Sequence, residues 1–286
     1  MQNTPLVLAP PPRRVPLSLF LANVFNIGSQ IGWAVFGFGM IFGWAFGSNA
    51  DLSMITFRGP HAQKTGIVTH VSRTGASENR SPVLANHYEF SVADSTYHGT
   101  SYSSGDSASE GDKVTIEYDE SHPERSRIVG MRRSLFGPAV MFVAIFPLIG
   151  ALFVVFAMRG GFRRNRLLRN GLIAGGKLLK REPTNVSVNR QPVWKLTFEF
   201  VGRDGRRHEA IARTTDPSRL EDEAQEPLLY DPDDPTSAYL LDELPARPEF
   251  EPNGDLRGRG FIGFASVIVP AIVIIANALM IAYKMR

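Results

Sequence analysis

The chain has 286 residues, enough for two modest domains with cores of their own, and its formal charge of +3 is small for this length. It contains no cysteine, which excludes disulfide bonds and any metal or redox chemistry that needs a thiol. The average composition, 43% hydrophobic and 21% charged, is that of a soluble protein, but the two kinds of residue are strongly segregated along the sequence.

Three stretches, 15–50, 134–158 and 260–283, contain no Asp, Glu, Lys, Arg or His. A helix needs roughly 20 apolar residues to cross a hydrocarbon core of about 30 Å, and each stretch is long enough. A single run of this kind is also compatible with a buried core helix, but three in one chain favour membrane spans. We therefore predict transmembrane helices at 16–47, 134–158 and 260–283.

A cleaved signal peptide is the alternative for the first stretch. Arg13 and Arg14 would form its charged start, and the sequence FGSNA imitates a cleavage site. The apolar region of a signal peptide is roughly 7 to 15 residues long, however, and this stretch is more than twice that length. We expect the segment to be retained.

The residues outside the spans complete the plan of the chain. A proline-rich sequence, APPPRR, predicts a disordered tail at its start. The polar segments are a disordered N-terminal tail at 1–15, a first β domain at 48–133, a basic juxtamembrane segment with a second β domain at 159–259, and a C-terminal tail at 284–286.

The two long polar segments align with each other. Their alignment places Tyr88-Glu89-Phe90 opposite Phe198-Glu199-Phe200, at a separation of about 110 positions. Other matched pairs are Gly66 with Gly176, Asp94 with Asp204, His98 with His208, Tyr118 with Tyr230, Asp119 with Asp231, and Pro123 with Pro235. A repeat of this kind predicts one structural unit used twice.

Each segment is typical of β structure. The sequences HYEFSV, WKLTFEFV and DKVTIEYD alternate apolar and polar residues, as half-buried strands do. The sequences ADST and GRDGRR favour hairpin turns. We predict two homologous small antiparallel sheets or barrels of about four to six strands, in which the Tyr-Asp-turn-Pro ending is a structural signature that closes the last strand.

On these residues both segments resemble the bacterial membrane-associated family called domain of unknown function 3592. The likeness rests on the Gly-x-Val start, the aromatic-Glu-Phe strand, the hairpin and the Tyr-Asp-x-x-x-Pro ending, over roughly 57–130 and 165–242. The first segment departs from the pattern because Asp94 is followed by Ser95 where a turn glycine is expected. The resemblance implies an architecture with two copies in one chain, and no activity.

The first span has two unusual faces. At 100° per residue four of its glycines fall within about 60° of one another, whereas its amide side chains gather on the opposite face together with Trp33 and Gly37. Small residues allow close helix approach, and amides in a bilayer need hydrogen-bonding partners, so we expect helix packing. An oligomer interface or a polar translocation path is the alternative. The expected packing residues are Gly28, Gly32, Gly39, Gly43, Asn23, Asn26 and Gln30.

Eight basic residues and no acidic one lie between 159 and 181. Such a cluster beside a span marks the cytoplasmic side and favours contact with anionic lipid headgroups rather than with nucleic acid. The orientation that follows has the N-terminus and the second β domain in the cytoplasm of a bacterium and the first β domain outside its inner membrane. The residues expected to contact lipid headgroups are Arg159, Arg163, Arg164, Arg166 and Arg169.

The remaining polar clusters predict no site. Twelve acidic residues lie within 216–251, but their spacing lacks the alternating ligands of a calcium loop. We expect a solvated loop that faces the basic start of its own domain. Five of the six histidines lie in the first β domain without a metal-binding spacing, and no nucleophile motif or phosphate-binding loop is present.

We therefore expect a non-catalytic interaction or accessory module of the bacterial envelope, with no catalytic residue, metal or cofactor. Its expected partners are membrane lipids and either an envelope protein or a second copy of the chain. Two alternatives remain open. One is a membrane-bound hydrolase that uses Ser, His and Asp residues of the first β domain, for which joint replacement of His70, His98 and Asp94 by alanine is the test. The other is an oligomeric transport component built on the amide face of the first span.

Overall fold

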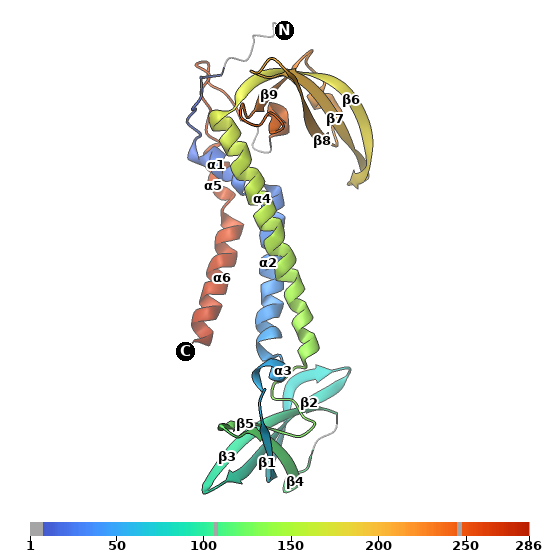
Figure 1. Cartoon of the computed structure of the whole chain (residues 1–286), viewed down its shortest axis with the longest axis vertical. Helices are drawn as coiled ribbons and strands as arrows, with labels where there is room; N and C mark the ends of the chain where they lie inside the picture. The colour runs from blue at the N-terminus through green and yellow to red at the C-terminus, as the bar shows by residue number, and fades with distance from the viewer. Residues whose placement is uncertain (1–7, 106–107, 245–247, 286) are drawn as a thin grey trace. The chain divides into compact units, whose positions relative to one another are not determined.

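The computed structural model describes residues 8–105, 108–244 and 248–285. It confirms the predicted fold class, because it contains three helices long and apolar enough to cross a membrane and two antiparallel sheets of five strands each (Figure 1). The chain divides into two units, which are described separately. We call residues 38–147 the sheet 1 unit, and residues 1–37 together with 148–286 the sheet 2 unit.

The first charge-free stretch forms two helices rather than one. α1 (Leu17–Val24) ends shortly before α2 (Ile27–Ala45) begins. Between them, the Asn26 side-chain oxygen accepts hydrogen bonds from the backbone N–H groups of Gly28 (3.0 Å) and Ser29 (3.3 Å). This is the bonding of a helix N-cap, so the amide expected on a packing face begins a new helix instead. α2 alone is about 28 Å long, enough to cross a bilayer core.

The other two spans also differ from their predicted bounds. A 3₁₀ helix, η2 (Pro138–Ala144), leads into α4 (Ile145–Asn170), which continues through the basic residues that follow position 158. The last span consists of a short helix, α5 (Gly260–Ala265), and α6 (Ile268–Lys284). The first five residues of the basic cluster, Arg159 to Arg169, therefore lie in a helix, and the other three lie in the strand that follows, β6 (Leu172–Val188).

In the sheet 1 unit the chain leaves α2 through η1 (Gly47–Asn49) and α3 (Ser53–Thr56). Five strands follow in the order β3-β2-β1-β4-β5. Their core holds the buried side chains of Val68, Tyr88, Phe90, Ile116, Tyr118 and Ile128. The strands are β1 (His61–Glu78), β2 (Ser81–Val92), β3 (Ser95–Ser104), β4 (Lys113–Asp119) and β5 (His122–Ile128).

In the sheet 2 unit five strands form a sheet with the order β10-β9-β6-β7-β8, which is the order of sheet 1 read from its other edge. Its core includes Leu196, Phe198, Phe200, Leu228 and Tyr230. The elements are β6 (Leu172–Val188), β7 (Gln191–Val201), β8 (Arg207–Thr214), η3 (Pro217–Leu220), β9 (Glu226–Tyr230), β10 (Ala238–Leu240) and η4 (Leu241–Glu243).

The two sheets share local details as well as strand order. Their longest hairpins turn at Asn79-Arg80 and Asn189-Arg190, where both residues have positive φ angles, as in the two-residue turns that suit twisted strands. Thr74 and Thr184 each donate a 2.7 Å side-chain hydrogen bond to a carbonyl on the facing strand. The first strand pair of each sheet has two register shifts, and corresponding shifts lie 110 positions apart.

The strand register changes one predicted match between the segments. His208 pairs with Phe200 in sheet 2, whereas the residue paired with the equivalent Phe90 in sheet 1 is Tyr97. The chain from Phe200 to its partner His208 is one residue longer than the chain from Phe90 to its partner Tyr97, which shifts the alignment after the turn. His208 therefore corresponds to Tyr97 and not to His98.

The predicted N-terminal tail is ordered from residue 8 onward, and its first seven residues lie outside the described part of the chain. The side chain of Arg13 is 5% exposed and donates hydrogen bonds to the carbonyl oxygens of Ala9, Leu168 and Gly171. The last carbonyls of a helix have no partner within it, so Arg13 satisfies the end of α4. That bonding overrides the disorder that the proline-rich composition predicts.

Candidate functional site

The repeat-signature residues play matching structural roles in the two sheets. The ring of Tyr118 lies 5.4 Å from that of Phe90, and the ring of Tyr230 lies 5.1 Å from that of Phe200. All four rings are buried. The tyrosine therefore closes the aromatic core at the end of each fourth strand.

The aspartates of the signature form the turns that follow. Asp119 accepts a hydrogen bond from the Ser121 N–H (2.9 Å), and Asp231 accepts one from the Asp233 N–H (3.1 Å). Neither turn ends its sheet, because β5 and β10 come next and pair with β4 and β9. The prediction that the motif closes each sheet is therefore wrong.

The two prolines of the signature occupy different places relative to the last strand of their sheets. Pro123 is the second residue of β5, which is an edge strand. Proline has no N–H group to donate, and an edge strand tolerates this because one of its sides has no partner strand. Pro235 lies in the turn before β10, outside any strand. Proline is thus compatible with strand pairing beyond the turn in both sheets.

The basic end of α4 contacts the acidic turn of sheet 2. Arg163 donates a 2.7 Å hydrogen bond to the Ser237 hydroxyl, and Arg166 pairs with Asp231 at 3.1 Å. Arg164 places its guanidinium 5.8 Å from the ring of Tyr239. The prediction that the acidic loop faces the basic start of its own domain is confirmed.

The other two arginines of this cluster behave differently. Arg159 and Arg169 are exposed, and their side chains have no hydrogen bond or ion pair within the described residues. Arg169 lines a cavity together with Arg14, which precedes α1 and has no side-chain partner in the described part of the chain either. The charge run predicts the cluster, but it does not separate its paired members from its unpaired ones.

The tips of the two long hairpins are held differently. We call residues 74–83 the sheet 1 arm and residues 184–193 the sheet 2 arm. Glu78 in the sheet 1 arm makes two 2.7 Å contacts with Arg132, and the Gly137 N–H donates to it at 3.3 Å. The hydrogen bond from Arg132 holds the pKa of Glu78 below its usual range. The corresponding residue of the sheet 2 arm is Val188, which is 50% exposed.

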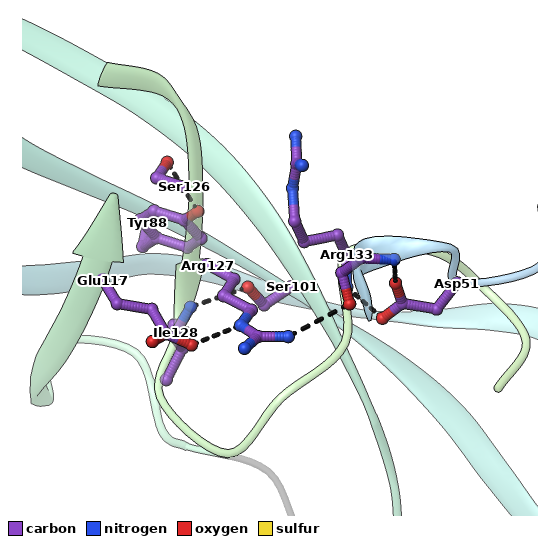
Figure 2. A network of polar contacts seen from close by, with 9 residues as sticks. Asp51, Tyr88, Ser101, Glu117, Ser126, Arg127, Ile128 and Arg133 are labelled. Atoms are coloured by element: carbon purple, nitrogen blue, oxygen red, sulfur yellow. Dashed lines mark hydrogen bonds and ion pairs between the residues drawn. The ribbon is translucent and has the colours of Figure 1, made fainter. Parts of the chain in front are cut away.

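A polar network lies where the chain enters and leaves sheet 1 (Figure 2). Asp51 accepts hydrogen bonds from the backbone N–H groups of Ser53 (2.8 Å) and Arg133 (3.0 Å). Burial alone would raise the pKa of Asp51, but the hydrogen bonds from Ser53 and Arg133 outweigh it and lower the pKa. The carboxylate therefore ties the segment after α2 to the segment that follows β5.

The same network continues into the core of sheet 1. Arg127 pairs with Glu117 and donates a 3.1 Å hydrogen bond to the Ser53 hydroxyl. Tyr88 and Ser126 share a 2.9 Å hydrogen bond between their hydroxyl groups. These partners are matched donors and acceptors, an arrangement typical of a structural network.

The two histidines and the aspartate chosen to test the hydrolase alternative have separate surroundings in sheet 1. His70 contacts Glu110 at 2.6 Å, and His98 lies 3.9 Å from Glu89. Asp94 lies in the turn between β2 and β3. Within the described residues no hydrogen bond or ion pair joins His70, His98 and Asp94 to one another.

A second histidine arrangement was not singled out by the sequence. His87 lies between the hydroxyls of Ser72 (3.4 Å) and Thr100 (3.0 Å), and its ring is 5.9 Å from that of His70. Strand alternation places these residues on one face of sheet 1, where His70 is exposed and His87 is partly buried. Cross-strand pairing, and not sequence spacing, brings them together.

Three carboxylates of the sheet 2 unit, those of Asp222 in a loop, Glu226 in β9 and Asp242 in η4, have oxygens within 4.8 Å of one another, as ligands of a metal ion do. Glu226 is 2% exposed and accepts a 3.0 Å hydrogen bond from the Glu223 N–H. Burial, followed by the nearby carboxylates, raises the pKa of Glu226. These residues could hold a cation, and sequence spacing gave no sign of them because they meet through tertiary packing.

The glycines of the first span lie at several helix contacts. A Cβ atom on Gly32 would lie 2.7 Å from the Val154 backbone nitrogen, and one on Gly39 would lie 2.6 Å from Pro147. A Cβ atom on Gly28 would contact Ala157 at 3.7 Å. These positions therefore face the second span.

Gly43 differs from the other three glycines, since a Cβ atom there would meet nothing within 4 Å. The expected packing role is therefore not seen at this position among the described residues.

The amides of the first span lie against two different neighbours. Asn23 donates a 2.8 Å hydrogen bond to the side chain of Asn165 in α4. Gln30 donates to the carbonyl oxygen of Ser266, just before α6. Asn23 and Gln30 therefore bond to other helical segments of the chain, as predicted for packing residues.

The fold and these contacts define a class: a helical membrane protein in which antiparallel β domains alternate with apolar spans. Within that class, residues 64–132, which run from β1 through β5, match the family model of the domain of unknown function DUF3592. The predicted resemblance is confirmed for this stretch. The second copy expected at 165–242 is outside the match and stays a prediction. Neither the curated proteins nor the solved structures include a significant match to the chain.

Proposed function

We propose that the chain is a non-catalytic interaction module of the bacterial inner membrane, and that the sheet 2 arm is its contact element. The observation that carries this proposal is the difference between the two arms. The sheet 1 arm is held by Glu78, whereas the sheet 2 arm exposes Val186 (59%) and Val188 (50%). A hairpin that presents apolar side chains without a partner in the described residues is suited to binding another protein.

The shared plan of the two sheets supports a binding role. Their common features are turns, register shifts and core aromatic residues, all of which set the shape of a sheet. Other side chains at matched positions differ in character, for example the apolar Val114 and the acidic Glu226, which pair with the glycines Gly66 and Gly176. We therefore regard the second sheet as a further copy of the DUF3592-like domain that presents a different surface.

Crosslinking in living cells tests the contact element. A photoreactive amino acid is placed at Val188, and the matched control carries it at Arg206, in the exposed turn between β7 and β8. We expect one defined protein to be captured from Val188 and not from Arg206, and its capture to be lost in the Val186→Asp variant. Equal capture from both positions, or capture that Val186→Asp leaves unchanged, would contradict the proposal.

The proposed orientation rests on charge and on the order of spans along the chain. Within about 12 residues of the spans, nine Lys and Arg residues lie on the side of the N-terminus and the second β domain, against seven on the other side. One span separates the two β domains in sequence, so the proposal has sheet 2 in the cytoplasm and sheet 1 outside. The third span then places the last residues outside as well.

The lack of cysteine makes this orientation easy to test. Ser104→Cys and Ser218→Cys each introduce a unique thiol at an exposed position. Ser104 suits this purpose better than Ser103, which accepts a hydrogen bond from Asn86. In intact cells an impermeant maleimide should label Cys at 104 and not at 218, and both should react after the membrane is permeabilised. The opposite pattern in intact cells would reverse the orientation.

A further inference from the structure

The sheet 2 unit contains a basic cavity of about 570 Å³ between α4 and the segment that precedes α1. Four of its lining residues are arginines, and none is acidic. The rest of the lining combines the apolar residues Pro12, Val15, Phe20 and Phe162 with the amides Asn165 and Asn170. The cavity thus combines a cluster of positive charge with an apolar wall.

Not all of these arginines are available to a ligand. Arg13 is buried, and its guanidinium group donates hydrogen bonds to three backbone carbonyl oxygens. Arg166 is paired with Asp231 at 3.1 Å. Arg14 and Arg169 are exposed and have no side-chain partner within the described residues. Because Arg13 fixes the end of α4, and its backbone N–H donates to the Arg169 carbonyl at 2.7 Å, the two unpaired arginines are held on one rim.

The cavity lies at the height of lipid headgroups if α4 crosses the bilayer. The last apolar residue of α4 before the basic run is Met158, and Phe162 follows one turn later, about 6 Å along the helix axis. Arg166 and Arg169 lie about 12 and 16 Å beyond Met158. Side chains on a helix tilt toward its N-terminus, so these arginines lean back toward the membrane.

Two aromatic residues, Phe20 and Phe162, contribute to the apolar wall of the cavity. The rings of Phe20 and Phe162 lie 5.9 Å apart at 60° to each other, one from each wall of the cavity. A phosphate group is recognised by the planar, multiple donors of guanidinium groups, and an acyl chain is recognised by an apolar wall. Few ligands other than a phospholipid combine both features in one molecule.

We propose that this cavity binds the phosphate of an anionic phospholipid, with Arg14 and Arg169 on the headgroup and Phe162 beside the start of an acyl chain. This site is distinct from the sheet 2 arm, so either proposal can fail without the other. The same charges could hold inorganic phosphate, which shares the headgroup chemistry but has no use for the aromatic wall.

Native mass spectrometry of the full chain in detergent tests the site. The probes are phosphatidylglycerol, phosphatidylcholine and inorganic phosphate. We expect phosphatidylglycerol to bind most tightly. The double variant Arg14→Gln with Arg169→Gln should weaken it about 30-fold, because each basic side chain near an anionic surface contributes roughly a factor of five. The control, Arg190→Gln with Arg203→Gln, removes the same charge from exposed positions in sheet 2 and should change binding less than about two-fold.

A second variant separates the two sources of phosphate. Phe162 is 49% exposed, so Phe162→Ala should leave the fold intact; we expect it to weaken phosphatidylglycerol binding and to leave inorganic phosphate binding unchanged. Equal losses in the arginine pair and its control would show a diffuse charge effect and overturn the proposal. Binding of phosphatidylcholine as tight as that of phosphatidylglycerol, or tighter binding of inorganic phosphate, would overturn it as well.

Discussion

The two sheets have the same strand order, the same two-residue turn between their longest strands and corresponding register shifts, yet they use this plan differently. In sheet 1 the arm is tied by Glu78 to the segment that enters the second span, and the hydroxyl of Tyr88 joins a buried polar network. In sheet 2 the residue equivalent to Glu78 is Val188, which cannot form an ion pair, and Phe198 stands where sheet 1 has Tyr88. The comparison teaches that backbone geometry can be repeated while the contacts made by individual side chains change.

The largest predicted effect concerns the pair Tyr88 and Gly99. A Cβ atom on Gly99 would lie far inside van der Waals contact with the Tyr88 phenol. In sheet 2 the matched pair is Phe198 and Ala210, where the phenylalanine has no hydroxyl. Gly99→Ala should therefore destabilise sheet 1 by about 2–3 kcal/mol through overpacking, as measured by hydrogen exchange in β2 and β3.

A second substitution turns this prediction into a test of coupling. Tyr88→Phe alone should cost about 1 kcal/mol, because the hydrogen bond to Ser126 is lost. The Cβ atom on residue 99 would also lie inside contact distance of the ring carbons of residue 88, so relief requires the ring to shift. Tyr88→Phe removes the hydroxyl and the hydrogen bond to Ser126 that holds the ring in place. Combined with Gly99→Ala it should therefore recover part of the stability that Gly99→Ala removes, since the ring can then move as the sheet 2 pair of Phe198 and Ala210 allows. Simple addition of the two costs would contradict the proposed equivalence of the two sheets.

The next effect concerns the tie on the sheet 1 arm. Glu78→Gln should remove its ion pair with Arg132 and raise the exchange rate of residues 74–83 about five-fold, which corresponds to roughly 1 kcal/mol. Because the pKa of Glu78 is lowered in the folded protein, its contribution is present above the usual carboxyl range and is lost as the pH falls through the lowered value.

Exchange in the two arms should therefore converge at low pH in the natural sequence and at all pH values in the Glu78→Gln variant. The control is Glu182→Gln, which removes an exposed carboxylate from sheet 2 beside Lys180. If residues 74–83 remain equally protected in Glu78→Gln, the ion pair does not hold the arm.

The smallest effect is a stabilisation of sheet 2. Burial raises the pKa of Glu226, so ionising this group is less favourable in the folded chain than in the unfolded chain. Its stability cost is therefore absent below the unfolded pKa and grows as the pH rises toward the folded value. Glu226→Gln should raise the midpoint of thermal unfolding of sheet 2 at pH 7 by a few degrees.

The pH dependence provides the check on this effect. The gain should vanish below about pH 4, where the natural carboxyl is protonated in both states. Glu199→Gln, at an exposed ion pair on β7, serves as the control and should show no such gain. A lower midpoint in Glu226→Gln at pH 7 would show that the carboxylate has a stabilising partner, such as a cation shared with Asp222 and Asp242.

Local patterns in the sequence were enough to predict the spans and the central strands. Hydrophobic runs and alternation depend on neighbouring residues, and the Tyr-Asp pairs mark the same turn in both sheets. The extra strands β5 and β10 were missed because the first is polar and the second has three residues, so each is stabilised by pairing with its neighbour and not by its own sequence.

The candidate lipid site shows the same limit. The charge run on α4 predicted basic residues near the membrane, but their pairing depends on where Asp231 and Ser237 lie in three dimensions. Arg13 and Arg14 looked like part of a tail because composition carries no information about a helix end 155 positions away. Sequence reasoning therefore located the charge and could not identify the cavity.

The hydrogen bonds from Arg13 to three carbonyl oxygens have a consequence for synthesis of the chain. Two of its three acceptors, the carbonyls of Leu168 and Gly171, are translated more than 150 residues after the arginine itself. At about 5–20 residues per second the ribosome needs roughly 8–30 s to reach them. During that interval the first helix can enter the bilayer, but Arg13, just before it, lacks two of its three hydrogen-bond acceptors. Arg13 can therefore be bonded to the end of α4 only after α4 has been synthesised.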